Sequence, residues 1–272
     1  MILAGRLKLI SNKGLGKHWP GMSQIIGYKK NWYKEWFGED YLTVYQHRDK
    51  SDAHRLVKLI SDQVHVTTES KLLDLACGNG RHAYILSEYS NNVFGLDLSF
   101  PLLKKAQRKK KSGKSPSFVR ADMRYFPFRI KFDVIFSLFT SFGYFDTDEK
   151  HLKVANEISD CLAENGTFVI DYFNSSYVKE HIVPYGQRRI GDITVLEKRW
   201  ISSKWVHKNI VIKKPGEEKY FQESVRLFEL AEISTLLDSA GIKIRRVFGD
   251  YLGADYSSVS KRMIIFAEKI SG

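Results

Sequence analysis

Lys71-Leu72-Leu73-Asp74-Leu75-Ala76-Cys77-Gly78-Asn79-Gly80-Arg81-His82 is the stretch of this 272-residue chain that decides its fold. Its leucines predict a short buried strand that leads directly into a turn with two glycines. Gly78 and Gly80 allow the backbone to turn tightly and to come close to a ligand. From about Arg81 we expect a helix whose free N–H groups point back at the turn. The stretch therefore predicts a strand, a glycine turn and a helix with a ligand site at their junction.

Two kinds of adenosine cofactor fit this turn. Gly78-x-Gly80-x-x-Ala83 satisfies the loose fingerprint of dinucleotide-binding proteins. Asp74, however, precedes the first glycine by four residues, and its charge would repel a pyrophosphate and attract a ligand with an ammonium and a sulfonium group. Asp97 follows a second apolar run, and a carboxylate there can bind the ribose hydroxyls of either cofactor. Asp74 therefore favours S-adenosylmethionine (SAM) over a dinucleotide.

The composition is typical of one large globular domain. Hydrophobic residues make up 43% of the chain, which is enough for a full core. The two cysteines, Cys77 and Cys161, fall in predicted core elements, so neither a disulfide framework nor a zinc site is indicated. No apolar run approaches the length of a membrane span, and Arg6 and Lys8 interrupt the segment where a signal peptide would be apolar. We expect a cytoplasmic protein without a membrane partner.

The net charge of +12 permits a nucleic acid, a phosphorylated substrate or an acidic partner and selects none of them. Residues 108–111 are four consecutive basic residues at the end of a predicted helix. A cationic last turn complements the helix dipole, so a solvated helix end explains this run better than a nucleic-acid patch.

Strand and helix patterns alternate from Lys71 onward, which predicts a parallel sheet with helices on both faces. The alternation breaks after a strand at residues 167–173. Three runs with a period of two follow, at residues 190–201, 205–213 and 220–228, and hairpin-like turns separate them. We therefore expect an antiparallel sheet inserted at about residues 185–229.

The quoted stretch, together with Gly95-Leu96-Asp97-Leu98-Ser99, Ala121-Asp122-Met123 and Leu162-x-x-x-Gly166, resembles the class I SAM-dependent methyltransferases. The resemblance extends from about Tyr41 to the C-terminus. Within this class the chain is most similar to small-molecule enzymes of the amino-sugar N-methyltransferase and glycine N-methyltransferase type. The resemblance implies an α/β fold: a doubly wound, seven-stranded Rossmann-like methyltransferase sheet with an inserted antiparallel sheet over the substrate pocket.

The resemblance also implies a domain organisation. Residues 1–30 are expected to be a loose N-terminal extension, because they show no clear period. Residues 31–272 are expected to form the methyltransferase domain, in which residues 31–62 are a helical lid over the cofactor.

A site for SAM, and for its product S-adenosyl-L-homocysteine (SAH), is implied by the same resemblance. Tyr41 and Tyr45 match a Tyr-x-x-x-Tyr pair on the inner side of the lid, and Arg48 follows at the expected distance. Asp122 is expected near the adenine amino group with Met123 against the ring, although a turn-forming Asp would look the same. The expected cofactor-binding residues are Tyr41, Arg48, Asp74, Ala76, Gly78, Asn79, Gly80, Asp97, Leu98, Asp122, Met123 and Leu138.

For the transfer site we expect Tyr45, Tyr144 and Asn174 as catalytic residues. Tyr144 stands where related amino-sugar enzymes have a catalytic histidine, so a hydrogen-bonding or shape role fits it better than a general base. Tyr172 and Arg262 are the expected substrate-binding residues. Arg262 matches a site that in such enzymes meets the anionic part of the substrate, and an isolated surface arginine explains it equally well.

Other prominent side chains have structural explanations. Trp32, Trp36 and Phe37 are explained by packing of the lid on the sheet. Capping and packing explain His82 better than catalysis does. No set of His, Cys and Glu has metal-ligand spacing, so no metal is expected.

Three functions fit these features. The first is transfer of the SAM methyl group to a nitrogen or oxygen of a small molecule, which can be anionic. The second is methylation of RNA or protein, which the charge would support. The residues 137–140 lack the Asp/Asn-Pro-Pro-aromatic loop of nucleobase amino methyltransferases, and the Pro-Cys nucleophile of cytosine-C5 enzymes is also absent, but ribose and guanine methylation stay open. The third is a noncatalytic module that binds SAM or a partner, against which Asp74, Asp97 and Asp122 argue.

Overall fold

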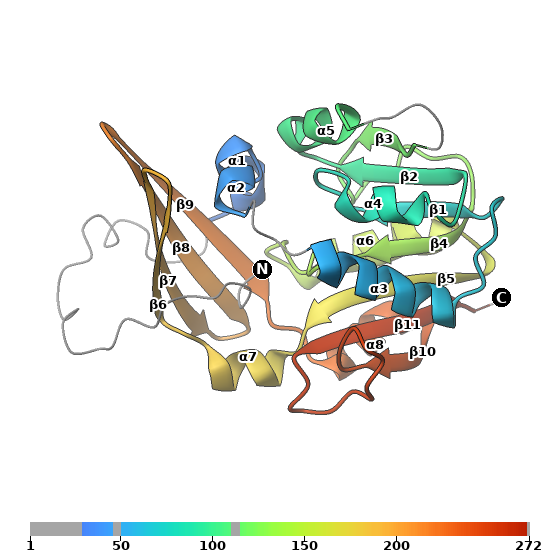
Figure 1. The fold of residues 1–272 in the computed structure, drawn as a ribbon. Coiled ribbons are helices and arrows are strands. Elements are labelled where there is room, and N and C mark those ends of the chain that lie inside the picture. The colour runs from blue at the N-terminus through green and yellow to red at the C-terminus, as the bar shows by residue number, and fades with distance from the viewer. Residues whose placement is uncertain (1–28, 46–49, 110–114, 271–272) are drawn as a thin grey trace.

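The computed structural model describes residues 29–45, 50–109 and 115–270, and its larger sheet has seven strands in the order β10-β11-β5-β4-β1-β2-β3 (Figure 1). The five strands β1 to β5 are parallel, and β11 is antiparallel to both of its neighbours, β5 and β10. These strands are β1 (Lys71–Leu75), β2 (Asn92–Asp97), β3 (Ser117–Arg120), β4 (Phe132–Ser137), β5 (Leu162–Phe173), β10 (Ile242–Phe248) and β11 (Arg262–Lys269). With the separate four-stranded sheet described below, this sheet confirms the predicted fold class.

Helices cover both faces of the large sheet because successive strand residues point to opposite sides. Leu72 packs in one hydrophobic cluster, with α3 (Lys50–Gln63) and α4 (Arg81–Leu86). Its neighbour Leu73 packs in the other cluster, with α6 (Asp148–Cys161) and α8 (Leu230–Asp238). The remaining helices are α1 (Trp32–Trp36), α2 (Glu39–Val44), α5 (Phe100–Gln107) and α7 (Ser175–His181). The central strands are therefore buried on both sides, as their continuous apolar runs predict.

The small sheet is antiparallel, with four strands in chain order: β6 (Tyr185–Ile190), β7 (Ile193–Ser202), β8 (Trp205–Lys214) and β9 (Glu217–Arg226). The sequence analysis expected three strands here and missed β6. The turn between β6 and β7 has only two residues, and Gly191 adopts a φ of 56° in it, so the turn falls at the start of the run expected at residues 190–201 and β6 precedes that run.

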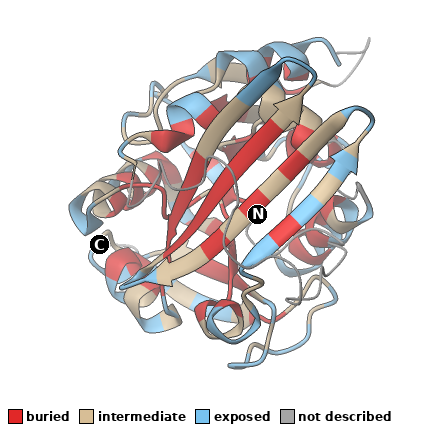
Figure 2. Ribbon diagram, turned by 90° about the vertical axis from the view of Figure 1, so that its left-hand side faces the viewer, coloured by how far each residue is buried: buried red, intermediate tan, exposed pale blue. Residues whose placement is uncertain are grey.

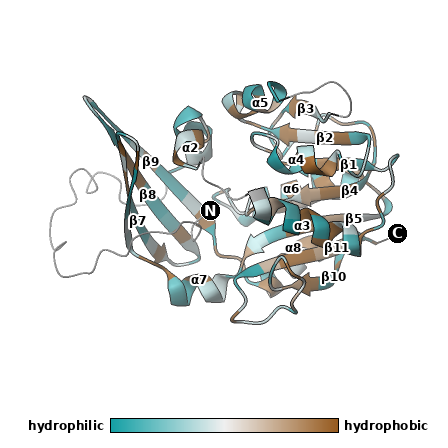
Figure 3. Cartoon of the chain, viewed as in Figure 1, coloured by the Kyte–Doolittle hydropathy of each residue, from teal (hydrophilic) through white to brown (hydrophobic). Residues whose placement is uncertain are grey.

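Burial and polarity differ between the two sheets. In the small sheet β8 is mostly buried, whereas the edge strand β6 is largely exposed (Figure 2). The strands of the large sheet are dominated by hydrophobic residues, and those of the small sheet are markedly more hydrophilic (Figure 3). The small sheet is therefore held by polar as well as apolar contacts.

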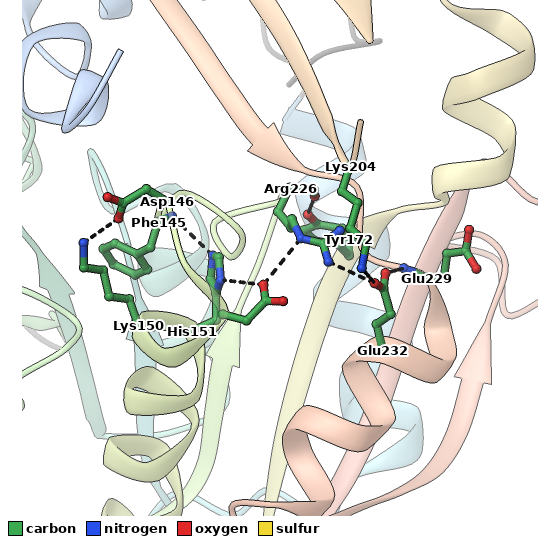
Figure 4. A network of polar contacts seen from close by, with 10 residues as sticks. Phe145, Asp146, Lys150, His151, Tyr172, Lys204, Arg226, Glu229 and Glu232 are labelled. Carbon is green, nitrogen blue, oxygen red and sulfur yellow. Dashed lines mark hydrogen bonds and ion pairs between the residues drawn. The ribbon is translucent and has the colours of Figure 1, made fainter. Parts of the chain in front are cut away.

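A network of polar contacts joins the small sheet to the large one (Figure 4). Arg226, at the end of β9, pairs through Nε with Asp148 Oδ1 on α6 at 3.4 Å and through Nη2 with Glu232 Oε1 on α8 at 2.9 Å. Its carbonyl oxygen also accepts a hydrogen bond from the hydroxyl of Tyr172 on β5. Arg226 thus fixes the last strand of the small sheet to three elements of the large domain, to α6 and α8 by its side chain and to β5 by its carbonyl.

His151 lies in the same region, fully buried on α6. Its Nε2 accepts a hydrogen bond from the backbone N–H of Phe145 at 3.2 Å, and its Nδ1 lies 3.8 Å from Asp148 Oδ1. Burial lowers the pKa of His151 to about 4, although the Asp148 carboxylate opposes this shift and the Arg226 charge adds to it. The imidazole is therefore neutral in the fold at neutral pH.

We expect the free energy of unfolding to fall by about 2 kcal/mol from this residue alone between pH 7 and pH 5. The unfolded histidine binds a proton below about pH 6.5, whereas the native imidazole stays neutral until near pH 4, so acid favours the unfolded chain. Urea denaturation of the wild type and of His151→Gln at pH 7, 6 and 5 measures this. Between pH 7 and pH 5, the free energy of unfolding of the variant should fall by about 2 kcal/mol less than that of the wild type. An equal fall in both proteins would contradict the low pKa of His151.

Candidate active site

A cavity of about 730 Å³ lies at the carboxyl ends of β1, β2, β3 and β4, beneath α1 and α2. Its volume is within the range of small-molecule and cofactor sites. Residues from five segments line it: Tyr33, Lys34, Glu35, Phe37, Gly38, Tyr41, Leu42 and Tyr45; Ala76, Cys77, Gly78, Asn79, Arg81 and His82; Leu96, Asp97, Leu98, Ser99, Phe100, Pro101, Leu102, Lys105 and Lys109; Arg120, Ala121, Asp122 and Met123; and Leu138, Phe139, Ser141, Tyr144 and Phe145. The strand–turn–helix stretch thus opens onto a cavity at the edge where a parallel sheet binds ligands.

The glycine turn has the left-handed backbone that the sequence predicts. Gly78 has a φ of 57° and Gly80 a φ of 74°, and Gly80 is also the N-cap of α4. A Cβ atom at Gly80 would come within 2.8 Å of the Phe118 ring, so no larger residue fits there. Ala76 adopts the same conformation, with a φ of 56°, although it has a side chain. The turn therefore holds an alanine in a conformation that favours glycine.

Asp97 ends β2 at the wall of the cavity. Its Oδ2 accepts a hydrogen bond from the Gly78 N–H and its Oδ1 accepts one from the Ser99 N–H, both at 2.7 Å. Burial raises the pKa of Asp97 to about 6, although these two N–H groups oppose the shift. A carboxylate oxygen can accept a second hydrogen bond, so Asp97 is able to bind two hydroxyl groups without losing its backbone contacts.

Asp74 lies in β1 with a relative exposure of 1% and is not itself part of the lining. Its Oδ2 has no hydrogen-bond partner within the described parts of the chain, whereas the Ala83 N–H reaches the carboxylate. Burial raises the pKa of Asp74 to about 7, and the charge of Asp97 adds to this. A buried acid with an unsatisfied oxygen next to this turn fits a positively charged ligand, because a cation would stabilise its ionised form.

Asp122 and Met123 follow β3 and line the opposite side of the cavity. Arg124 binds Asp122 with Nη2 to Oδ2 at 2.5 Å and Nε to Oδ1 at 3.0 Å. Burial would raise the pKa of Asp122, but the hydrogen bonds and charge of Arg124 outweigh it and hold the pKa below its usual value. Asp122 is therefore ionised and oriented at the cavity.

The lid side of the cavity consists of aromatic rings. The ring centroids of Phe37 and Tyr41 are 4.9 Å apart, and those of Tyr41 and Tyr45 are 5.1 Å apart. Ser99 is the N-cap of α5. Its hydroxyl donates a hydrogen bond to the Phe37 carbonyl at 2.5 Å, which ties the end of α1 to the large domain. Trp32, Trp36 and Phe37 are packed as expected, but Phe37 also lines the cavity.

The loop after β4 is held in a strained conformation. Phe139 and Thr140 have φ values of 60° and 61°, a region that costs energy for residues with side chains. Asp171 on β5 accepts the Phe139 N–H through Oδ2 at 2.9 Å and the Thr140 N–H through its carbonyl at 2.8 Å. Arg262 in turn lies 2.6 Å from Asp171 Oδ1 and donates to Thr140 Oγ1 at 3.1 Å. The buried pair thus fixes the loop that carries the cavity wall.

Of the residues proposed for catalysis, Tyr45 and Tyr144 line the cavity, and Tyr144 donates its hydroxyl to the Thr140 carbonyl at 2.7 Å. Asn174, Tyr172 and Arg262 are not part of the lining. Asn174 caps α7 and donates to the carbonyl groups of Ser257, Ser258 and Ser260, and Tyr172 contacts Arg226. Their roles at the reaction centre stay predictions, and Arg48 lies outside the described residues.

All predicted cofactor residues that the structure describes, except Asp74 and Gly80, line the same cavity: Tyr41, Ala76, Gly78, Asn79, Asp97, Leu98, Asp122, Met123 and Leu138. Gly80 itself contributes by its turn, with its N–H bonded to the Cys77 carbonyl at 3.0 Å. The sequence analysis missed the basic side chains of the lining: Lys34, Arg81, Lys105, Lys109 and Arg120. In the sequence, Lys105 and Lys109 are one helical turn apart, and this spacing was the pattern from which a basic patch at the cavity could have been predicted.

The comparisons with known proteins agree with this geometry. Residues 72–166 match a family model described as a methyltransferase domain. A putative methyltransferase of Bacillus subtilis is 27% identical over 74% of this chain and 85% of its own length. A dTDP-3-amino-3,4,6-trideoxy-alpha-D-glucopyranose N,N-dimethyltransferase of Streptomyces venezuelae is 24% identical over 66% of this chain and 78% of its own. A solved SAM-dependent methyltransferase of Clostridium acetobutylicum covers 86% of this chain and 98% of its own with a TM-score of 0.74 at 20% identity.

The chain is a SAM-dependent methyltransferase, and it resembles the enzymes of class I. Within that class it resembles the amino-sugar N-methyltransferases, and its methyl donor is SAM. The described residues contain no group of three His, Cys, Asp or Glu side chains that could hold a metal ion. Nor does any helix in the described parts of the chain have the length and apolar character needed to cross a membrane.

We expect Asp97→Ala to weaken SAM binding by roughly 1–3 kcal/mol, since ligand hydroxyls would lose their acceptor in a buried site. Titration calorimetry with SAM measures the change. Asp62→Ala, which removes an exposed carboxylate on α3, is the matched control and should leave the affinity unaltered. An unchanged affinity of Asp97→Ala would remove Asp97 from the donor site.

Ala76→Gly should raise the free energy of unfolding by about 0.5–1 kcal/mol. The left-handed conformation costs alanine roughly 1–2 kcal/mol, and the greater freedom of glycine in the unfolded chain offsets part of the gain. Denaturant unfolding of the variant provides the value. Destabilisation instead would show that the Ala76 methyl group makes a packing contact worth more than the strain.

Proposed function

We propose that the protein transfers a methyl group to a small anionic molecule. The preferred acceptor is the nitrogen of an amino group, and an oxygen atom is the alternative. The observation that carries the proposal is one cavity that combines the Asp97 and Asp122 carboxylates with aromatic rings and five basic side chains. The names of relatives support the amine: one acts on a dTDP-linked amino sugar. A solved structure at 19% identity with a TM-score of 0.68 is titled a sugar N-methyltransferase.

Charge supports an anionic acceptor. Lys34, Lys105 and Lys109 belong to the lining and come from α1 and the α5 region, on two sides of the cavity. Arg81 and Arg120 add two further cations. These five cations outnumber the three acidic side chains of the lining, Glu35, Asp97 and Asp122, and such an excess of positive charge raises the local concentration of anions. A phosphate or carboxylate on the acceptor would be attracted to this rim.

When bound, SAM supplies a methyl group on a positively charged sulfur, which keeps the carbon–sulfur electron pair as the acceptor nitrogen forms its new bond to carbon and then loses a proton. Asp97 would orient the donor through its hydroxyl groups, and Asp74, buried in β1 next to the glycine turn, would stabilise its positive charge from outside the lining. The aromatic rings of the lid exclude water from the reacting atoms. Tyr144 has committed its hydroxyl proton to Thr140, so it acts by shape and as a hydrogen-bond acceptor. Alignment thus carries most of the catalysis.

RNA remains the second candidate acceptor, since basic side chains of α5 lie at the cavity and the chain carries a charge of +12. Heparin chromatography tests it: a nucleic-acid binder should elute late and lose affinity steeply with salt. Early elution would argue against RNA.

We expect labelled SAM to transfer its methyl group to small molecules. Purified protein is incubated with labelled SAM and cell extract, and the small-molecule, RNA and protein fractions are separated. In a second arm, the dTDP-3-amino sugar of the Streptomyces venezuelae relative is compared with its matched analogue that has a hydroxyl in place of the amine. Label in the small-molecule fraction, and faster methylation of the amine, is the expected result. Label confined to RNA or protein would overturn the proposal.

A further inference from the structure

Besides Arg226, the small sheet contains four charged side chains that are almost completely buried. Lys208 and Glu223 have relative exposures of 0%, Glu197 of 1% and Arg199 of 6%. Such side chains are seldom buried unless they are paired, because removing a charge from water is costly. We call these four residues the buried charge cluster.

The cluster lies on one face of the sheet. Lys208 on β8 stands directly opposite Glu223 on β9 and Arg199 on β7, and cross-strand partners share a face. Lys208 Nζ lies 2.7 Å from Glu223 Oε2 and 4.0 Å from Glu197 Oε1, and Arg199 pairs with Glu197. The pairing explains how the charges tolerate burial, but not why they are present.

The cluster also extends into the lid. Glu223 Oε1 accepts hydrogen bonds from the Trp36 indole N–H at 2.6 Å and from the Tyr45 hydroxyl at 3.3 Å. Lys208 donates to the same Tyr45 hydroxyl. The Trp36 ring rests on Phe221 of β9 with centroids 4.7 Å apart. One ion pair therefore contacts a residue of α1 and the residue that ends α2.

Further polar contacts hold α2 against the small sheet. Asp40 lies 3.1 Å from Lys214 Nζ and 3.0 Å from Lys219 Nζ. Arg188 on β6 donates to the Val44 carbonyl at 3.2 Å. These contacts lie nearer the surface, so Lys208 and Glu223 are the dry centre of the attachment.

On the other side, α1 and α2 form a wall of the cavity through Phe37, Tyr41 and Tyr45. No residue of β6 to β9 is part of the lining that the described residues form. The small sheet therefore supports this wall from behind without entering the cavity.

We propose that Lys208 and Glu223 are positioning residues for the methyl-donor site. They hold Tyr45 and Trp36, and thereby keep α1 and α2 in the position that completes the cavity wall. The small sheet thus controls donor binding from behind the wall, without contributing to the lining that the described residues form. This inference depends on the SAM site alone and not on the acceptor proposed above, so the two fail separately.

The charge states determine which variants are informative. Burial lowers the pKa of Lys208, and the two glutamates oppose this shift. Burial would raise the pKa of Glu223, but Lys208 and the Trp36 hydrogen bond outweigh it and keep the pKa low. Removing Lys208 alone leaves the buried Glu223 charge uncompensated and risks unfolding, whereas removing the Glu223 charge alone still leaves Lys208 within 4.0 Å of Glu197. Removing both charges together is the cleaner test.

The experiment compares the double variant Lys208→Met/Glu223→Gln with the wild type, using SAH as the ligand in titration calorimetry. We expect the double variant to fold and to bind SAH about tenfold more weakly, with faster amide hydrogen exchange in residues 31–45. Arg245→Met/Glu268→Gln removes an exposed ion pair between β10 and β11 and should leave both readouts unchanged. Wild-type SAH affinity and exchange in the folded double variant would overturn the proposal.

Two further measurements keep the proposal falsifiable if the double variant does not fold. Glu223→Gln alone should shift the Trp36 indole resonance in a proton–nitrogen spectrum, because the charged acceptor is lost, and should weaken SAH in parallel. Tyr45→Phe removes only the hydroxyl that both partners hold, and should reproduce the faster exchange of residues 31–45, with Tyr125→Phe as the exposed control. A shifted indole resonance with unaltered SAH affinity and unaltered exchange would overturn it.

Discussion

The geometry of the cavity depends on one carboxylate, that of Asp97, which bonds the glycine turn after β1 and the start of α5 to the end of β2. Gly78 and Ser99 belong to different strand–helix units, and both direct a backbone N–H at the same side chain. Ser99 then holds the lid through the Phe37 carbonyl. Burial opposes ionisation of Asp97, and the two N–H groups recover part of that cost. The position of the lid over the turn is therefore set by a short chain of hydrogen bonds that begins at the cavity.

Strain is concentrated at the same site. Ala76, Phe139 and Thr140 all adopt left-handed backbone conformations, and all three belong to the turns that follow β1 and β4. The Asp171–Arg262 pair holds the second turn from two strands, β5 and β11. Conformations of this kind persist only where the surrounding structure determines them. The antiparallel edge of the sheet thus contributes to the active site although it lies far from the glycine turn in sequence.

The sequence predicts most of the large sheet, because its strands and helices differ in period and because Asp74 and Asp97 mark the ends of two strands. It does not predict β6, since a two-residue turn leaves the period of two almost uninterrupted. It also leaves open where Asn174 and Arg262 act. Both have partners on distant segments, residues 257–260 for Asn174 and Asp171 for Arg262, and such contacts become visible only in the folded chain. The basic lining was likewise hidden, because its members come from four separate segments.

The attachment of α1 and α2 to the small sheet joins residues 32–44 to residues 185–226, which are widely separated in the chain. The two segments form one physical unit with a shared buried ion pair, whereas the glycine turn and the strands behind it belong to another. An exchange of either segment between related enzymes would therefore have to transplant both segments together. A chimera that carries only one of them would place a buried lysine or glutamate opposite a foreign surface, and the cavity would lose the support of its α1–α2 wall.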